Sequence, residues 1–149
     1  MTEGPEVVDL PTLRRLIEHL PQGDDLTLIV LKGHLLIEER LLDLVRAKLE
    51  ADDPALKEAR LRFSQLLPLA RAASGRDQYP WFWEALEKLN ALRNDLAHHL
   101  EPKQVERLST ALIDHLRQPA DLRSTDSLAT SLRGAVAFMY GALSSFKNP

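Results

Sequence analysis

The stretch LNALRNDLAHHLEP, residues 89–102, contains four side chains that could do chemistry together, Arg93, Asn94, His98 and His99. An arginine presents a fork of donors to phosphate oxygens, and a histidine can move a proton near neutral pH. An asparagine can hold that ring or donate to an oxyanion. These groups suit ribonucleolytic transfer, in which a base deprotonates the 2′-hydroxyl and a cation stabilises the charge that builds at phosphorus. The pattern suggests no metal, because neighbouring histidines point about 100° apart on a helix.

Helical periodicity distributes these side chains over several flanks of one expected helix. The core stripe consists of the apolar positions within about 60° of one direction, namely Phe82, Leu89, Leu92, Leu96 and Leu100. Arg93 lies at the edge of this stripe, Asn94 at about 140° and His98 at about 180° from it. His98 is therefore expected to point away from the core of its own subunit, with Asn94 one turn earlier on the same surface. Asp95 and His99 fall at about 240° and 280° and are expected to support the site.

The same residues allow a structural interpretation. In it, Arg93 pairs with a carboxylate such as Glu38, and the two histidines are solvated or lie near the helix end, where the helix dipole favours positive charge. Glu38 falls in an apolar stripe of an earlier helix, with His34 one turn before it. A carboxylate there needs a partner, because burying an unpaired charge is costly. Glu38 is therefore expected to be a third supporting residue.

The elements that must position these side chains are all helical. Leucine dominates the chain, apolar residues recur at three- and four-residue spacing, and no alternation typical of a strand stands out. We expect an all-α, single-domain, up-and-down bundle of about six helices spanning residues 1–149, with residues 119–126 as a linker before the last helix. Asp9 is expected to cap the first helix. The expected helices cover approximately residues 7–20, 25–49, 53–74, 81–100, 102–117 and 127–146, the third being kinked or broken before Pro68.

Three apolar patterns bear on packing. The second helix is apolar almost all round, so it is expected to be central in the bundle or also buried against another subunit. One of its stripes consists of Leu31, Leu35, Leu42, Val45 and Leu49. A small-residue face on the last helix could serve internal packing or an oligomer contact; it consists of Gly134, Ala137, Phe138, Gly141 and Ala142. An aromatic cluster is expected in the core or an interface rather than stacked on bases; it consists of Tyr79, Trp81, Phe82 and Trp83.

Composition limits the remaining function classes. The net charge is −3 with no basic block, so any contact with RNA must be local or assembled from more than one subunit. The chain has no cysteine, which excludes thiolate metal sites and a cysteine nucleophile. Its first residues are acidic and polar, and no apolar run approaches the roughly 20 residues of a membrane span. We expect a cytoplasmic protein with no membrane partner, no cofactor and no metal.

The segment LRNDLAHHLEP resembles the signature of the HEPN superfamily, the higher eukaryotes and prokaryotes nucleotide-binding domains. That signature is an arginine, a polar residue that is often asparagine, and a histidine after four to six intervening residues; here Arg93, Asn94 and His98 match it. The spacing also favours His98 over His99 as the acting histidine. The upstream segments LIVLKGHLLIEERLLDLV and LRFSQLLPLARA are similar to small stand-alone bacterial members. The resemblance spans residues 26 to 101.

The resemblance implies a homodimeric helical bundle whose two motif helices face each other across a two-fold axis. Active members are metal-independent endoribonucleases with a cleft shared between subunits, and many act in toxin–antitoxin, abortive-infection or CRISPR systems. Carried over, Arg93 would contact phosphate, His98 would transfer protons and Asn94 would support them. Leu100 stands where toxins paired with a nucleotidyltransferase antitoxin usually carry tyrosine, so that pairing is in doubt, while another antitoxin or regulatory protein stays open. The alternatives are a non-catalytic regulatory or scaffold dimer, including a transcription-regulator-like one, and a nucleotide-binding module.

Overall fold

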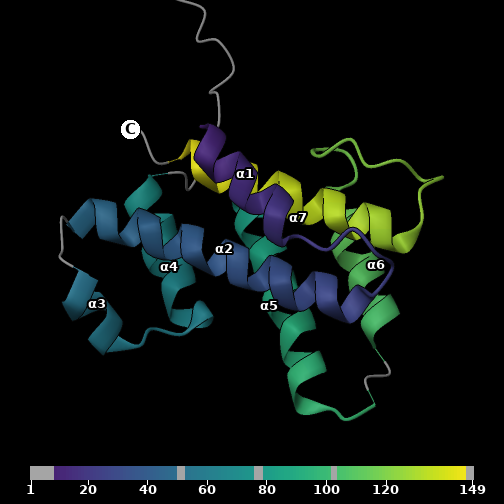
Figure 1. Ribbon diagram of the computed structural model, residues 1–149, viewed down its shortest axis with the longest axis horizontal. Helices are drawn as coiled ribbons and strands as arrows, with labels where there is room; N and C mark the ends of the chain where they lie inside the picture. Colours follow the sequence, from purple (N-terminus) through teal and green to yellow (C-terminus); the bar gives the residue numbers. More distant parts are fainter. Residues whose placement is uncertain (1–8, 50–52, 76–78, 102–103, 147–149) are drawn as a thin grey trace, which may run out of the picture.

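The computed structural model describes residues 9–49, 53–75, 79–101 and 104–146, and every regular element in these ranges is an α-helix (Figure 1). The expectation of an all-α bundle is confirmed, with seven helices in place of about six. They are α1 (Leu10–His19), α2 (Leu26–Leu49), α3 (Asp53–Ala59), α4 (Phe63–Ser74), α5 (Pro80–His98), α6 (Val105–Leu116) and α7 (Leu128–Ser145). The linker predicted at residues 119–126 lies between α6 and α7.

Short polar side chains begin several of these helices. Asp9 accepts a hydrogen bond from the Thr12 amide at 2.9 Å and caps α1 as predicted, and Ser127 accepts one from the Thr130 amide at 3.2 Å and caps α7. Each bond satisfies a backbone donor that the first turn of a helix otherwise leaves unpaired. Gly75 ends α4 in the left-handed region at a φ of 66°, which a side chain would disfavour.

The break in the helix expected over residues 53–74 was predicted at the wrong residue. The chain leaves the helical path at Arg60, whose φ is 49°, and α4 starts afresh at Phe63. The Gln65 side chain accepts from the Arg62 amide at 2.8 Å and so closes the first turn of α4. Pro68 lies inside α4 without ending it.

Helix α2 is the central helix and packs against α7, α4 and α5. Its buried apolar positions are Ile29, Val30, Leu36, Ile37, Leu41, Leu44 and Val45. In the stripe singled out from the sequence, Leu31, Leu35 and Leu49 are instead 38%, 57% and 60% exposed. On a helix that is apolar all round, periodicity alone does not say which face meets the neighbouring helices.

Helices α2 and α7 approach each other closely at Gly33 of α2. A Cβ at this position would lie 2.8 Å from Cγ2 of Val136 in α7, so only a residue without a side chain allows the two backbones to come this near. The small-residue face predicted on α7 is half-buried, and a Cβ at Gly141 would meet nothing within 4 Å. A Cβ at Gly134 of the same face would lie 3.0 Å from Cδ2 of Leu122, in the segment before α7, so the small residue at the contact between α2 and α7 is Gly33.

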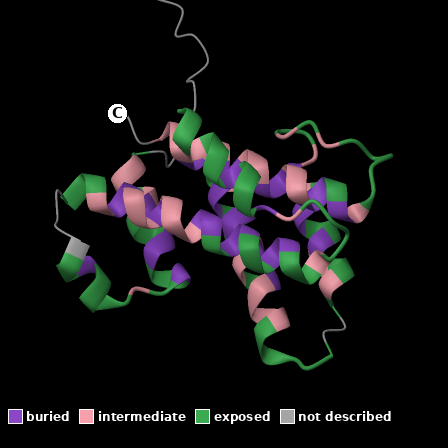
Figure 2. Ribbon diagram, viewed as in Figure 1, coloured by how far each residue is buried: buried purple, intermediate pink, exposed green. Residues whose placement is uncertain are grey.

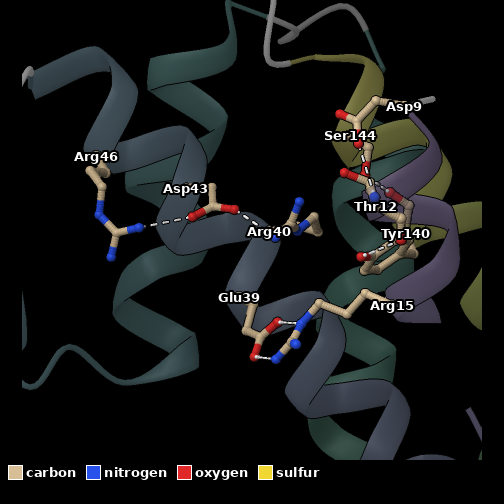
Figure 3. A network of polar contacts seen from close by, with 9 residues as sticks. All are labelled: Asp9, Thr12, Arg15, Glu39, Arg40, Asp43, Arg46, Tyr140 and Ser144. Carbon is tan, nitrogen blue, oxygen red and sulfur yellow. Dashed lines mark hydrogen bonds and ion pairs between the residues drawn. The ribbon is translucent and has the colours of Figure 1, made fainter. Parts of the chain in front are cut away.

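A polar network joins α1 to α2 and α7 (Figure 3). The Arg15 guanidinium donates two hydrogen bonds to the Glu39 carboxylate, at 2.7 and 2.6 Å. The Tyr140 hydroxyl donates to the Thr12 carbonyl at 3.0 Å, and the Arg40 guanidinium lies 5.5 Å from the centre of the Tyr140 ring. These contacts fix α1 in place although three of its apolar residues remain exposed.

Helix α5 is buried over its first two-thirds, as far as Leu92, and exposed in its last turn. Phe82 and Trp83 near its start are each 1% exposed, as expected of a core cluster, whereas Tyr79 of the same predicted cluster is 39% exposed. Trp81 stacks on Phe138 with ring centroids 6.3 Å apart. The His115 Nε2 lies 2.7 Å from the Trp81 carbonyl and ties α6 to the same turn. The last turns of α5 extend beyond the neighbouring helices and pass from buried to exposed (Figures 1 and 2). The residues predicted to do chemistry lie on this projecting end.

Candidate functional site

A solvent-open pocket of about 550 Å³ lies between the C-terminal half of α5, the middle of α2 and the start of α4. From α5 it is lined by Asn90, Arg93, Asn94 and His98. Asn90, Asn94 and His98 recur every four positions and Arg93 follows Asn90 by three, so they share one broad face of the helix. The Arg93 guanidinium donates to the side-chain oxygen of Asn94 at 3.4 Å. The structure thus brings all three predicted catalytic residues to one pocket.

The wall formed by α2 contains a buried histidine. His34 is 4% exposed, its Nε2 lies 3.0 Å from the Asn90 side-chain oxygen, and its ring stacks on Phe63 with centroids 4.3 Å apart. Because the asparagine oxygen can only accept, Nε2 carries the proton in the neutral ring. Burial lowers the pKa of His34, and Arg93 acts in the same direction. The ring is therefore a neutral, firmly held part of the pocket wall.

Glu38 lies one turn after His34 on the same wall. Its Oε2 is 3.7 Å from His34 Nδ1, and its side chain is 37% exposed. Burial raises the pKa of Glu38, while the Arg93 charge opposes that rise. No direct ion pair joins Glu38 to Arg93 among the described residues, so the predicted pairing is present only as an attraction across the pocket.

Two of the predicted supporting residues lie outside the pocket. His99 and Asp95 form their own pair, with His99 Nδ1 at 3.2 Å from Asp95 Oδ1 and 3.0 Å from the Asp95 carbonyl. The reason is geometric, since α5 ends at His98 and the following ring leaves on another flank. The structure therefore separates His99 from His98.

Sequence reasoning missed three polar residues of the pocket, Asn90, Arg62 and Ser64. Asn90 could have been identified from the sequence, because it precedes Asn94 by four residues and so extends the polar face of α5 by one turn. Arg62 and Ser64 could not, because they belong to a segment whose helix start was not recognised. Arg62 adds a second cation to the pocket beside Arg93.

The buried His34 predicts a dependence of folding stability on pH. Its pKa is lowered on folding from 6.5, so between 6.5 and that lowered value the unfolded chain binds more protons than the folded one. Stability that is complete above pH 6.5 is therefore expected to fall as the pH drops through this window. Urea unfolding of wild type and His34→Gln between pH 5 and 8 measures it. The variant keeps a donor for Asn90 but cannot titrate, and equal pH slopes in both proteins would contradict the expectation.

Other classes of site are not evident in the part of the chain that the structure describes. No group of three or more histidine, aspartate or glutamate side chains in these ranges is arranged to hold a metal ion. No described helix combines the length and apolar character that crossing a membrane requires.

Comparison with known proteins does not suggest a function. The chain was compared with family models, curated proteins and solved structures, and none of them matches it.

Proposed function

We propose that this protein is an endoribonuclease that needs no metal and cleaves RNA through the 2′-hydroxyl, in the manner of the HEPN-like proteins its motif resembles. One observation carries the proposal: Arg93, Asn94 and His98 line a single open pocket that also holds a second arginine, a carboxylate and a buried imidazole. This donor set fits a phosphodiester, because two guanidinium groups can bind its oxygens and a histidine can transfer a proton beside them.

Each side chain has a role that follows from its position. Arg93 and Arg62 bind the scissile phosphate and stabilise the charge of the pentacoordinate transition state. His98 lines the pocket, is exposed to solvent and transfers a proton to or from the RNA. Asn94, which accepts from Arg93, holds the guanidinium in place. The absence of a direct Arg93–Glu38 ion pair weighs against a purely structural role for the arginine.

The proposal includes a homodimer in which two copies of the pocket share one cleft. His98 is exposed and is the last residue of α5, and the last turns of this helix extend beyond the neighbouring helices (Figure 1), where a second subunit can reach them. A two-fold axis beside this end would bring two sets of cations together. That arrangement would let a chain of net charge −3 form a local binding site for a polyanion.

Cleavage of labelled single-stranded RNA in the presence of EDTA tests the proposal. Wild type is expected to release products with a 2′,3′-cyclic phosphate and a 5′-hydroxyl, and Arg93→Ala to lower kcat/KM by about 100- to 1,000-fold through lost charge stabilisation. Arg107→Ala is the matched control, because this arginine of α6 is exposed and donates only to Gln104 among the described residues. No cleavage of single-stranded or structured RNA by wild type would contradict the proposal.

A further inference from the structure

Cleavage through the 2′-hydroxyl needs two proton transfers on opposite sides of the phosphorus. One group removes the proton of the attacking hydroxyl, and another gives a proton to the departing 5′-oxygen. His98 can perform one of these transfers in a given turnover. The other needs a second titratable group that faces the same pocket from a different direction.

Glu38 occupies that position. It projects from α2 into the pocket, whereas Arg93 and His98 line the wall formed by α5. The Glu38 side chain is 37% exposed, and the neighbouring His34 side chain is 5% exposed. Of the two groups on α2, only the carboxylate is therefore open to an RNA hydroxyl.

The surroundings of Glu38 suit a base rather than a permanent anion. His34 donates from Nε2 to Asn90, so its unprotonated Nδ1 faces the Glu38 carboxylate at 3.7 Å. Two acceptors that face each other repel, and a proton on the carboxylate removes this repulsion. Burial acts in the same direction and raises the pKa of Glu38.

The other charged groups of the pocket come from the elements packed against α2. Arg93 and His98 belong to α5, and Arg62 directly precedes α4. Arg93 keeps the ionised carboxylate accessible, because its charge partly offsets the effect of burial on the pKa of Glu38. Neither arginine forms a direct ion pair with Glu38 among the described residues, so both remain available to bind phosphate.

We propose that Glu38 is the general base of the cleavage reaction and His98 its general acid, an assignment that rests on the proposed function. The Glu38 carboxylate takes the proton of the 2′-hydroxyl, and O2′ forms a bond to phosphorus. The bond between phosphorus and O5′ breaks, and protonated His98 gives its proton to O5′. The products are a 2′,3′-cyclic phosphate and a 5′-hydroxyl, and exchange with water restores both groups.

The competing explanation is that a second copy of His98, from another subunit, supplies the base. The two assignments differ in what the pH profile of kcat/KM contains. If Glu38 is the base, the acid limb reports its deprotonation and the alkaline limb reports loss of the proton from His98. If two histidines act, replacing Glu38 leaves both limbs in place.

The test measures pH profiles of RNA cleavage for wild type, Glu38→Gln, Glu38→Asp and Glu39→Gln. Glu38→Gln is expected to lower kcat by about 100-fold or more and to remove the acid limb, because the amide cannot accept the proton. Glu38→Asp is expected to restore part of the rate together with an acid limb. Glu39→Gln is the matched control, since the adjacent carboxylate pairs with Arg15 on the α1 side.

Binding of an uncleavable RNA, with a 2′-deoxy sugar at the scissile position, separates catalysis from folding. Glu38→Gln is expected to bind this RNA as wild type does. An active Glu38→Gln with its acid limb intact would overturn the inference and leave the nuclease in place. Equal loss of binding and cleavage would also overturn it, because Glu38 would then hold the pocket together. A wild type that cleaves no RNA would remove the proposed function and the inference with it.

Discussion

Replacing His98 with alanine is expected to slow RNA cleavage by about two to four orders of magnitude, the contribution typical of a positioned proton-transfer group. The fold is expected to survive, because His98 is exposed at the last position of α5 and contributes at most a dipole interaction of about 0.3–1 kcal/mol. Single-turnover cleavage with saturating protein measures the effect on the chemical step. Circular dichroism and thermal unfolding of the same sample measure whether the fold is retained.

His99→Ala is the control for this substitution. It removes the same ring from the next residue, but His99 pairs with Asp95 outside the pocket and is expected to leave the rate unchanged. Comparing the two variants tests whether the position of the histidine in the pocket matters, and not only the presence of a histidine in the motif. Equal losses in both variants, or none in His98→Ala, would contradict the role given to His98.

Replacing Trp83 with alanine is expected to destabilise the protein by about 3–5 kcal/mol, as for other large aromatic side chains removed from a core. Trp83 is 1% exposed and packs against Phe82 at 5.3 Å and Phe146 at 6.2 Å between ring centroids. A chain of this size loses roughly 3 °C in Tm for each kcal/mol, so thermal unfolding should shift by about 10 °C or more.

The Trp83→Ala substitution is also expected to affect the pocket indirectly, because Trp83 lies near the start of α5, the helix that carries the motif residues. Trp83→Phe keeps an aromatic ring in the cavity and is expected to cost less than the alanine variant. Urea unfolding of both variants gives the two free energies. An alanine variant as stable as wild type would show that this end of α5 is not anchored by its aromatic residues.

The face on which the motif side chains lie could be read from the sequence. Helical spacing alone placed Asn94 and His98 together and away from the core stripe, and the structure has both on the pocket and His98 exposed. The same reasoning placed His99 on a different flank. These predictions succeed because neighbours on one helix are related by a fixed rotation per residue.

Tertiary packing determines which residues form the wall of the pocket that faces α5. His34 and Asn90 lie 56 positions apart along the chain and meet only because α2 and α5 pack together. Arg62 joins them because the third expected helix breaks at Arg60 rather than before Pro68. Neither the contact between His34 and Asn90 nor the position of Arg62 can be predicted from residues that are close together in the sequence.

By itself, then, the sequence determined the helical class and the polar face of α5, because both depend on spacings within one segment. It did not determine which side of α2 is buried, since Leu35 and Ile37 are equally apolar yet are 57% and 0% exposed. Only the packing of neighbouring helices distinguishes them, including the contact at Gly33 that admits Val136. That choice of face buries His34 and brings Glu38 to the pocket, so the second wall of the site exists only in the folded chain.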